Sequence, residues 1–263
     1  MPAPPIAPQL LAELAQLALL TASGAAEVLS GYSVTALKEV GTKSSPTDMV
    51  SEADRASEAY IVGALRRERP DDSLLGEEGA RFEGNSGVAW LADPLDGTTN
   101  FLYGIPAYGI SLAATYNGQL VTGAVVNPVT GEKWWAAKGK GAWQDGSPCH
   151  VAEGRSDLST ALVATGFGYQ PELRAQQAEL LPRLLPVVRD IRRFGSAALD
   201  LCWVASGRYD AYYESNLNDW DWAAGRLICE EAGGKVTMLP GNMLLATTPS
   251  LSEPLARLLR GLS

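Results

Sequence analysis

A chain of 263 residues, 46% hydrophobic and 19% charged, can bury a sizeable core as one large domain or two packed halves. Its formal net charge of −9 argues against a nucleic-acid-binding surface, which would need a basic footprint. The N-terminal segment lacks the basic region and apolar core of a signal peptide, so we expect a soluble, cytoplasmic protein that binds neither membranes nor nucleic acids.

The cysteine and histidine content narrows the chemistry. The three cysteines, Cys149, Cys202 and Cys229, are widely spaced and form no C-x-x-C pair. This argues against a disulfide scaffold or a zinc site and indicates a reducing compartment. The single histidine, His150, lies in a polar turn region, so we do not expect a reaction built on a histidine base.

Two helices are predicted within the first 70 residues. Residues 9–30 repeat apolar side chains at a helical period, but the most apolar part, Leu10 to Leu20, is too short to span a membrane and contains Glu13. A second helix begins after Ser51, which suits the N-cap position, and Asp54 follows as in a capping box. Asp54 therefore has a structural role available in the first turn of that helix.

The segment W-L-A-D-P-L-D-G-T-T-N-F combines a strand with polar groups. The apolar strand over 88–92 ends in two carboxylates, Asp93 and Asp96. Pro94 biases Asp93 toward an extended conformation, and Gly97 frees the backbone before two threonine hydroxyls. Two acids beside a Gly-Thr turn with free N–H groups suit a divalent metal ion that faces a phosphate. The alternative is an ordinary aspartate-rich turn, because Asp-Pro and Asp-Gly pairs are common turn formers.

The remaining chain predicts a change of architecture near residue 155. Residues 108–151 predict an antiparallel meander with a hairpin turn at 117–118. Strands and helices alternate afterwards, so we expect two α/β halves, 1–154 and 155–263. Two prolines are expected to kink a helix over 172–189. The other expected elements are strands at 161–165, 191–194, 209–214, 235–239 and 244–247, and helices at 196–206, 219–232 and 253–262.

Carboxylates follow several predicted strands and begin one predicted helix. Glu77 follows a short strand at 73–76, and Asp221 lies at the start of the helix at 219–232. Strand ends and helix starts are where α/β proteins gather their sites. Clustered buried carboxylates repel one another unless cations neutralise them, and ligation by oxygen alone indicates a hard cation such as Mg²⁺. The candidates for one such site are Asp54, Glu77, Asp93, Asp96, Glu214 and Asp221.

Several blocks of this sequence together resemble the inositol monophosphatase family, metal-dependent phosphatases that lithium inhibits. The blocks are K-S-S-P-T-D-M-V-S-E-A-D (43–54), G-E-E (76–78), W-L-A-D-P-L-D-G-T-T-N-F (90–101), G-S-A-A-L-D (195–200), A-Y-Y-E (211–214), W-D-W-A-A-G (220–225) and E-A-G-G (231–234). The resemblance implies the layered α/β/α/β/α sandwich shared with fructose-1,6-bisphosphatase, and commonly a homodimer.

The resemblance also implies a set of metal ligands. One Mg²⁺ would be held by Glu77, Asp93 and the backbone carbonyl of Leu95. A second would be held by Asp93, Asp96 and Asp221, and a third, weaker one is often placed near Glu77. Two or three Mg²⁺ ions per site are therefore implied.

Catalytic and substrate-binding roles carry over in the same way. Thr98 and Asp54 would be hydrogen-bonded to each other and help Glu77 to position the attacking water. Backbone N–H groups of Gly97 and Thr98 would hold the phosphate, and the hydroxyls of the alcohol would lie against the second half of the chain. The implied substrate-binding residues are Gly97, Thr98, Gly195, Ser196, Ala197, Glu214 and Asp221.

The function that we expect is Mg²⁺-dependent hydrolysis of inositol 1-phosphate or a similar polyol phosphate. Histidinol phosphate, fructose 1,6-bisphosphate and adenosine 3′,5′-bisphosphate are alternative substrates on the same scaffold, and a regulatory binding protein that retains the fold is another alternative. Lys43 either helps to attract phosphate or is a solvated loop lysine. Trp222 is larger than the residue expected after Asp221, and we expect it to narrow the substrate pocket.

Overall fold

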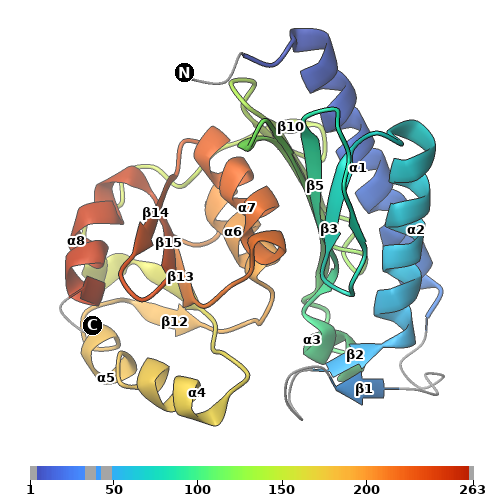
Figure 1. The fold of residues 1–263 in the computed structure, drawn as a ribbon. Helices are drawn as coiled ribbons and strands as arrows, with labels where there is room; N and C mark the ends of the chain where they lie inside the picture. The colour runs from blue at the N-terminus through green and yellow to red at the C-terminus, as the bar shows by residue number, and fades with distance from the viewer. Residues whose placement is uncertain (1–4, 33–39, 43–48, 261–263) are drawn as a thin grey trace.

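Five layers of secondary structure stack in the order helices, sheet, helices, sheet, helices (Figure 1). The computed structural model describes residues 5–32, 40–42 and 49–260. The outer helices on one side are α1 (Pro8–Ser30) and α2 (Glu52–Glu68), the central ones are α6 (Ala197–Ala205) and α7 (Asp219–Glu231), and those on the other side are α4 (Pro171–Ala178), α5 (Leu181–Leu184) and α8 (Pro249–Arg260). The expected α/β/α/β/α sandwich is confirmed.

The large sheet has eight strands in the order β10-β9-β8-β7-β6-β5-β3-β4. Its strands are β3 (Ser73–Gly76), β4 (Arg81–Phe82), β5 (Val88–Asp96), β6 (Gly109–Tyr116), β7 (Gln119–Val126), β8 (Lys133–Ala137), β9 (Ala142–Gln144) and β10 (Ser147–Cys149). The predicted meander is confirmed, because every pair from β5 to β10 is antiparallel. The pair β3–β5 is parallel, so both strands end at the same edge.

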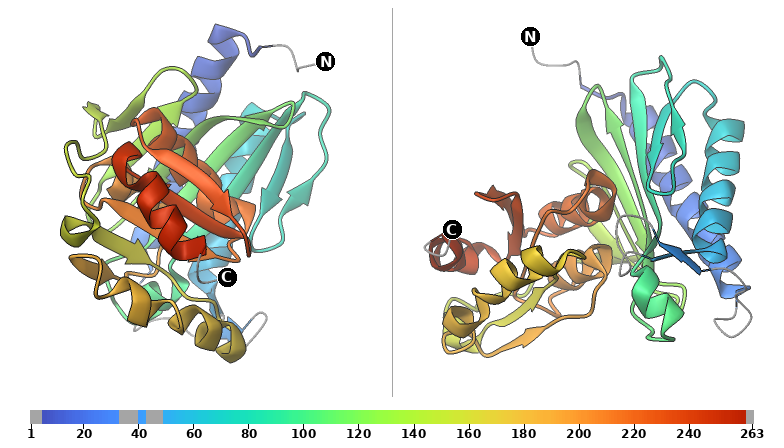
Figure 2. Two further views of the ribbon diagram at one scale, coloured as in Figure 1. Left: turned by 90° about the vertical axis from the view of Figure 1, so that its left-hand side faces the viewer. Right: turned by 60° about the horizontal axis from the view of Figure 1, so that its bottom comes forward.

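The small sheet has five strands in the order β12-β11-β13-β15-β14. They are β11 (Leu162–Thr165), β12 (Asp190–Arg192), β13 (Ala211–Ser215), β14 (Lys235–Leu239) and β15 (Met243–Thr247). The boundary at 154/155 stays a prediction, since α6 and α7 of the second half pack between the two sheets (Figure 2).

The main differences between the predicted and the observed elements lie at three places. The helix expected over 172–189 is two short helices, α4 and α5, because Pro182 lies at the start of α5 and cannot donate the hydrogen bond that would continue α4. A short helix, α3 (Thr98–Leu102), follows Gly97 and was not predicted. Strands β1 (Val40–Thr42) and β2 (Met49–Ser51) pair just before α2 and were also not predicted.

Helix α1 is long and apolar enough to cross a membrane by length and composition alone, which is weak evidence because a core helix of a globular protein passes the same test. One face of α1 is buried and packs on β6, β7 and α2. Leu14 and Leu29, which are fully buried, lie on this face. The apolar character of α1 is thus explained by its place in the first core layer.

The central layer requires small residues where α7 meets its neighbours. A Cβ atom at Gly123 of β7 would lie 2.7 Å from Cα of Ala224, and one at Gly225 would lie 2.6 Å from Cβ of Leu201 on α6. The A-A-G part of the W-D-W-A-A-G block is therefore a packing requirement. It seats α7 against the large sheet, and α7 carries Asp221 into the site.

Replacing Gly123 by alanine should lower the free energy of unfolding by about 1–3 kcal/mol, because the new methyl group meets the Ala224 backbone and cannot be relieved by a side-chain rotation. Urea unfolding checks this. Gly63→Ala is a matched control, because a Cβ at Gly63 on α2 meets no atom within 4 Å. Equal stability of the two variants would contradict the packing argument.

Candidate active site

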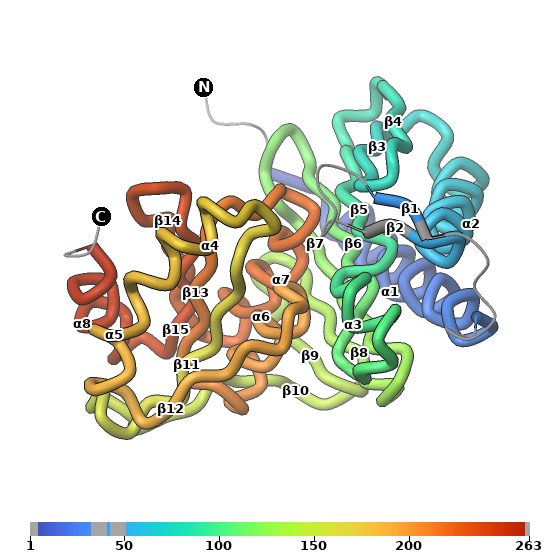
Figure 3. Tube along the Cα trace, turned by 90° about the horizontal axis from the view of Figure 1, so that it is seen from below, coloured from blue at the N-terminus to red at the C-terminus, as the bar shows by residue number. Residues whose placement is uncertain are grey.

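A cavity of about 450 Å³ lies at the end of the large sheet where β5 runs into α3, and residues from both halves of the chain line it. Figure 3 looks onto this end of the molecule, with α3, α7 and α4 in view. The predicted site residues that line it are Glu77, Asp93, Leu95, Asp96, Gly97, Thr98, Gly195, Ala197, Glu214 and Asp221. Asp54 and Ser196 do not line the cavity but hydrogen-bond to residues that do.

Three carboxylates from three elements meet in this cavity. Glu77 and Asp93 come together because β3 and β5 are parallel neighbours, and the backbone N–H of Glu77 donates to the carbonyl of Ala92 at 3.1 Å. Asp221 joins them from the first turn of α7, where it accepts the Asn218 N–H at 2.7 Å. One carboxylate oxygen of each acid lies within 4.8 Å of the others, a spacing suited to a shared cation.

A β-bulge directs Asp93 and Asp96 into the same cavity. Between these residues β5 advances by three positions, while β6 advances by two, from Ser111 to Gly109. Residues three apart on a regular strand point to opposite faces, and the extra residue of a bulge brings them back to one face. Pro94 suits this irregular position, because it has no N–H to offer to the β6 ladder.

Asp96 is tied to the start of α6. Its Oδ2 accepts from the Ser196 hydroxyl at 2.6 Å and from the Ala198 N–H at 2.7 Å. Burial raises the pKa of Asp96 to about 7, although both hydrogen bonds act in the opposite direction. Asp96 lies in the cavity but outside the group formed by Glu77, Asp93 and Asp221. The observed contact of Ser196 is with Asp96, and its role in substrate binding stays a prediction.

The electrostatics of the acidic group fit a divalent cation. Burial, followed by the charges of Glu77, Asp96 and Asp221, raises the pKa of Asp93 well above its ordinary value. Burial and then the charges of Asp96 and Glu77 raise the pKa of Asp221 in the same way. Packed carboxylates that favour protons in this way also favour a cation in their place, and a set of oxygen donors matches Mg²⁺.

The metal-free protein should lose stability as the pH rises. The folded-state pKa of Asp96, about 7, lies above its ordinary value of 3.8. Its protonation therefore stabilises the fold fully below about pH 4, and this contribution is lost as the pH rises through about 7. We expect the Tm of chelator-treated protein to fall between about pH 5 and about pH 8, and Mg²⁺ to restore it.

Differential scanning fluorimetry checks this result, with Asp96→Asn as the comparison, because asparagine cannot titrate. The Tm difference between the wild type and this variant should change with pH in the metal-free state. If this Tm difference were constant with pH, the titration of Asp96 would not account for the loss of stability.

A threonine hydroxyl is fixed beside the acidic group. Gly97, with φ of 95° in the left-handed region, turns the chain into α3, and Thr98 is the first residue of that helix. The Thr98 hydroxyl donates to Oδ1 of Asp54 at 2.8 Å and lies 3.1 Å from the Leu95 carbonyl. Asp54 is anchored through its other oxygen by Ser51, as the predicted capping box requires. Asp54 thus caps α2 and also orients Thr98.

Glu214 lines the same cavity from β13 of the small sheet. It accepts from the Tyr212 hydroxyl at 2.7 Å, and burial raises its pKa while that hydrogen bond lowers it. Arg193 also lines the cavity and was missed in the sequence, although it lies two residues before the G-S-A-A-L-D block. Its guanidinium covers Gly195, where a Cβ would lie 2.2 Å from Nη1. Arg193 is the positively charged residue among the described residues that line the cavity.

The expectation that Trp222 narrows the substrate pocket is wrong. Trp222 lies in a separate surface pocket beside the β6–β7 hairpin, with the Arg226 guanidinium 5.5 Å from its ring centroid. Successive residues of a helix point about 100° apart, so the side chain after Asp221 turns away from the cavity. Trp220 lines the cavity instead. Lys43 lies outside the described residues.

Comparisons of the sequence and of the structure with known proteins find the same group of relatives. The model of the "Inositol monophosphatase family" matches residues 10–259. The chain is 45% identical over 230 residues to "Inositol-1-monophosphatase SuhB" of Mycobacterium tuberculosis, a match that covers 82% of this chain and 79% of the relative. It is 43% identical over 205 residues to "Nus factor SuhB" of Pseudomonas aeruginosa, covering 74% of each. The crystal structure of extragenic suppressor protein SuhB from Bartonella henselae matches with a TM-score of 0.87 and 36% identity, over 93% of this chain and 97% of that one.

Proposed function

Because the chain belongs to the inositol monophosphatase family, we propose that it is a Mg²⁺-dependent phosphomonoesterase that hydrolyses inositol 1-phosphate to inositol and phosphate. The observation that carries this proposal is the convergence of Glu77, Asp93 and Asp221 within 4.8 Å, in the cavity that also contains Thr98.

The metal ligands would be Glu77, Asp93 and Asp221, together with Asp96 and the carbonyl of Leu95, for two or three Mg²⁺ ions. When bound, the ions supply positive charge for the phosphate oxygens and for the departing alkoxide, and they lower the pKa of a coordinated water. Asp93 would be the ligand to share, because it is the buried member of this group and lies within 4.8 Å of both other acids.

The chain itself would position water and substrate. Thr98, oriented by Asp54, would hold the attacking water with Glu77, and the N–H groups of Gly97 and Thr98 would face the phosphate. Among the lining residues from the second half of the chain, Glu214 would accept hydrogen bonds from polyol hydroxyls, with Gly195 and Ala197 in the same cavity. In-line attack would require the water and the leaving alcohol to lie on opposite sides of the phosphorus. The polar wall around Glu214 supports a hydroxyl-rich alcohol.

Arg193 supports a second candidate substrate class, one with another anionic group on the alcohol. Fructose 1,6-bisphosphate and adenosine 3′,5′-bisphosphate belong to this class, whereas histidinol phosphate does not. The test is phosphate release from these three esters and from inositol 1-phosphate, each with and without Mg²⁺. We expect inositol 1-phosphate to have the highest kcat/KM and every activity to require Mg²⁺. If inositol 1-phosphate ranks last, the substrate assignment is wrong.

The alternative outside enzymes is a regulatory binding protein. The relative named as a Nus factor supports this alternative. The convergence of the acidic set favours the enzyme. A homodimer, a cytoplasmic location and inhibition by lithium stay predictions.

A further inference from the structure

One face of α2 contacts two of the three segments that carry the acidic group, the turn with Glu77 and the chain just after Asp93. Asp54, Ser57 and Glu58 are spaced three and four residues apart, which places them on the same side of the helix. All three are buried. Asp54 accepts from Thr98, and the Ser57 hydroxyl donates to the Pro94 carbonyl at 2.8 Å, so these two residues fix the loop after Asp93.

Glu58 fixes the other loop, the turn after β3. Its Oε1 accepts from the Glu78 N–H at 3.0 Å, and its Oε2 accepts from the Ala80 N–H at 3.3 Å. The same turn is closed by a 2.7 Å hydrogen bond from the Gly76 N–H to the Ala80 carbonyl. Glu77 is within this turn, so the direction of its side chain depends on the backbone that Glu58 holds.

Gly76 makes room for this carboxylate. A Cβ at Gly76 would lie 2.3 Å from Oε1 of Glu58, which is closer than real Cβ atoms approach any neighbour. Gly76 does not have a positive φ, so its backbone conformation alone does not require glycine. The glycine of the G-E-E block is therefore explained by the position of Glu58.

We propose that Glu58 is a positioning residue that sets the affinity of the site for its divalent cation by fixing the turn that carries Glu77. This inference rests on the proposed metal site. Ligand carboxylates bind a cation well only when they are held in place beforehand, and losing an outer hydrogen-bond partner typically weakens metal binding about 10- to 100-fold. Asp54 and Ser57 hold the segment after Asp93 in the same way, so α2 supports the backbone beside both Glu77 and Asp93, which the β3–β5 pairing brings together.

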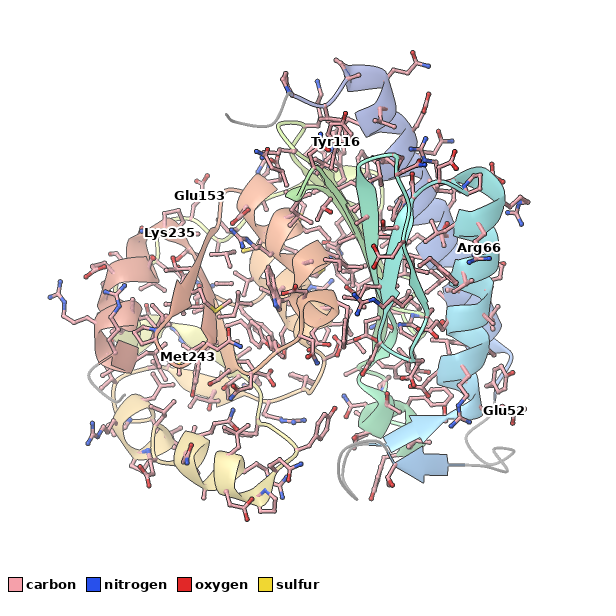
Figure 4. The ribbon with its side chains drawn as sticks, viewed as in Figure 1. Glu52, Arg66, Tyr116, Glu153, Lys235 and Met243 are labelled. Atoms are coloured by element: carbon pink, nitrogen blue, oxygen red, sulfur yellow. The ribbon has the colours of Figure 1, made fainter. Side chains whose placement is uncertain are left out.

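The test uses Mg²⁺ and Tb³⁺ without substrate. Tb³⁺ luminescence, excited through tryptophan such as Trp220 in the cavity wall, reports binding, and displacement of Tb³⁺ by Mg²⁺ gives the Mg²⁺ dissociation constant. In Glu58→Gln one of the two N–H groups faces an amide that cannot accept its hydrogen. We expect the Mg²⁺ dissociation constant to rise about tenfold. Glu52→Gln is the charge-matched control, because Glu52 is exposed at the start of α2 (Figure 4).

Gly76→Ala provides a second route that leaves the charge unchanged. The new methyl group should push the flexible end of Glu58 away from the turn and weaken Mg²⁺ binding by a similar factor, whereas Gly63→Ala should leave it unchanged. The double variant Gly76→Ala/Glu58→Gln should bind Mg²⁺ no more weakly than the worse single variant, since both remove the same contact.

Two results separate this inference from the proposed function. If Glu58→Gln lowers Tm but keeps the wild-type Mg²⁺ dissociation constant, Glu58 is only structural and the proposal is overturned. If Glu58→Gln does not fold, Gly76→Ala replaces it, and a wild-type Mg²⁺ dissociation constant in that variant overturns the proposal. If the wild type binds Mg²⁺ but releases phosphate from no ester, the proposed function fails while the binding experiment still tests Glu58.

Discussion

Asp93→Asn is expected to lower kcat for Mg²⁺-dependent phosphate release by about 10³-fold or more, because it removes the buried carboxylate of the group that Glu77, Asp93 and Asp221 form. The same change should not destabilise the metal-free protein. Burial and three neighbouring acids raise the pKa of Asp93 well above its ordinary value, so the ionised form is disfavoured in the fold. A neutral amide of the same shape relieves that repulsion.

Activity and stability should therefore respond in opposite directions. Phosphate release at saturating Mg²⁺ and the Tm in chelator, both near pH 8, measure the two effects. Asp71→Asn is the matched control, since Asp71 is exposed and does not line the cavity. Near-normal turnover of Asp93→Asn would contradict the assignment of Asp93 as a metal ligand. A Tm well below that of the wild type would mean that the lost activity reflects a damaged fold.

The fold was largely predictable because its elements carry local signals. The capping box of Ser51 and Asp54 marked the start of α2, and apolar runs marked β3 and β5. The break between α4 and α5 was not predicted, because a proline can either kink a helix or end it, and tertiary packing decides which. The short helix α3 was also missed, since five residues carry too little periodicity to detect.

The residues that form the site were easier to predict than the hydrogen bonds that hold them in place. Acids at strand ends and at a helix start pointed to Glu77, Asp93 and Asp221, which the structure brings together. The hydrogen bonds of Asp96 to α6 join residues 100 and 102 positions apart, and no local pattern encodes them. The Trp222 prediction failed for a related reason: one residue along a helix changes the direction of a side chain, and sequence proximity to Asp221 does not give proximity to the cavity.

Thr98→Val is expected to lower kcat by about 10²-fold while leaving Mg²⁺ affinity close to that of the wild type. Valine keeps the branched shape but lacks the hydroxyl that Asp54 orients in the wild type. The variant therefore has no group at this position to orient the attacking water. The change also removes the 2.8 Å hydrogen bond to the buried Asp54 carboxylate, which should cost about 1–3 kcal/mol of stability. Metal binding should persist, because the proposed ligands and the hydrogen bonds of Glu58 to the turn after β3 are untouched.

Thr98→Ser distinguishes a hydroxyl requirement from a packing requirement. Serine loses the methyl group but can still donate to Asp54, so it should recover most of the wild-type kcat and most of the stability. Steady-state kinetics across Mg²⁺ concentrations, with Tb³⁺ displacement for affinity, give the comparison. If the serine variant were as slow as the valine variant, the methyl group rather than the hydroxyl would matter. If valine instead raised the Mg²⁺ dissociation constant and kept kcat, Thr98 would act on the metal site and not on the water.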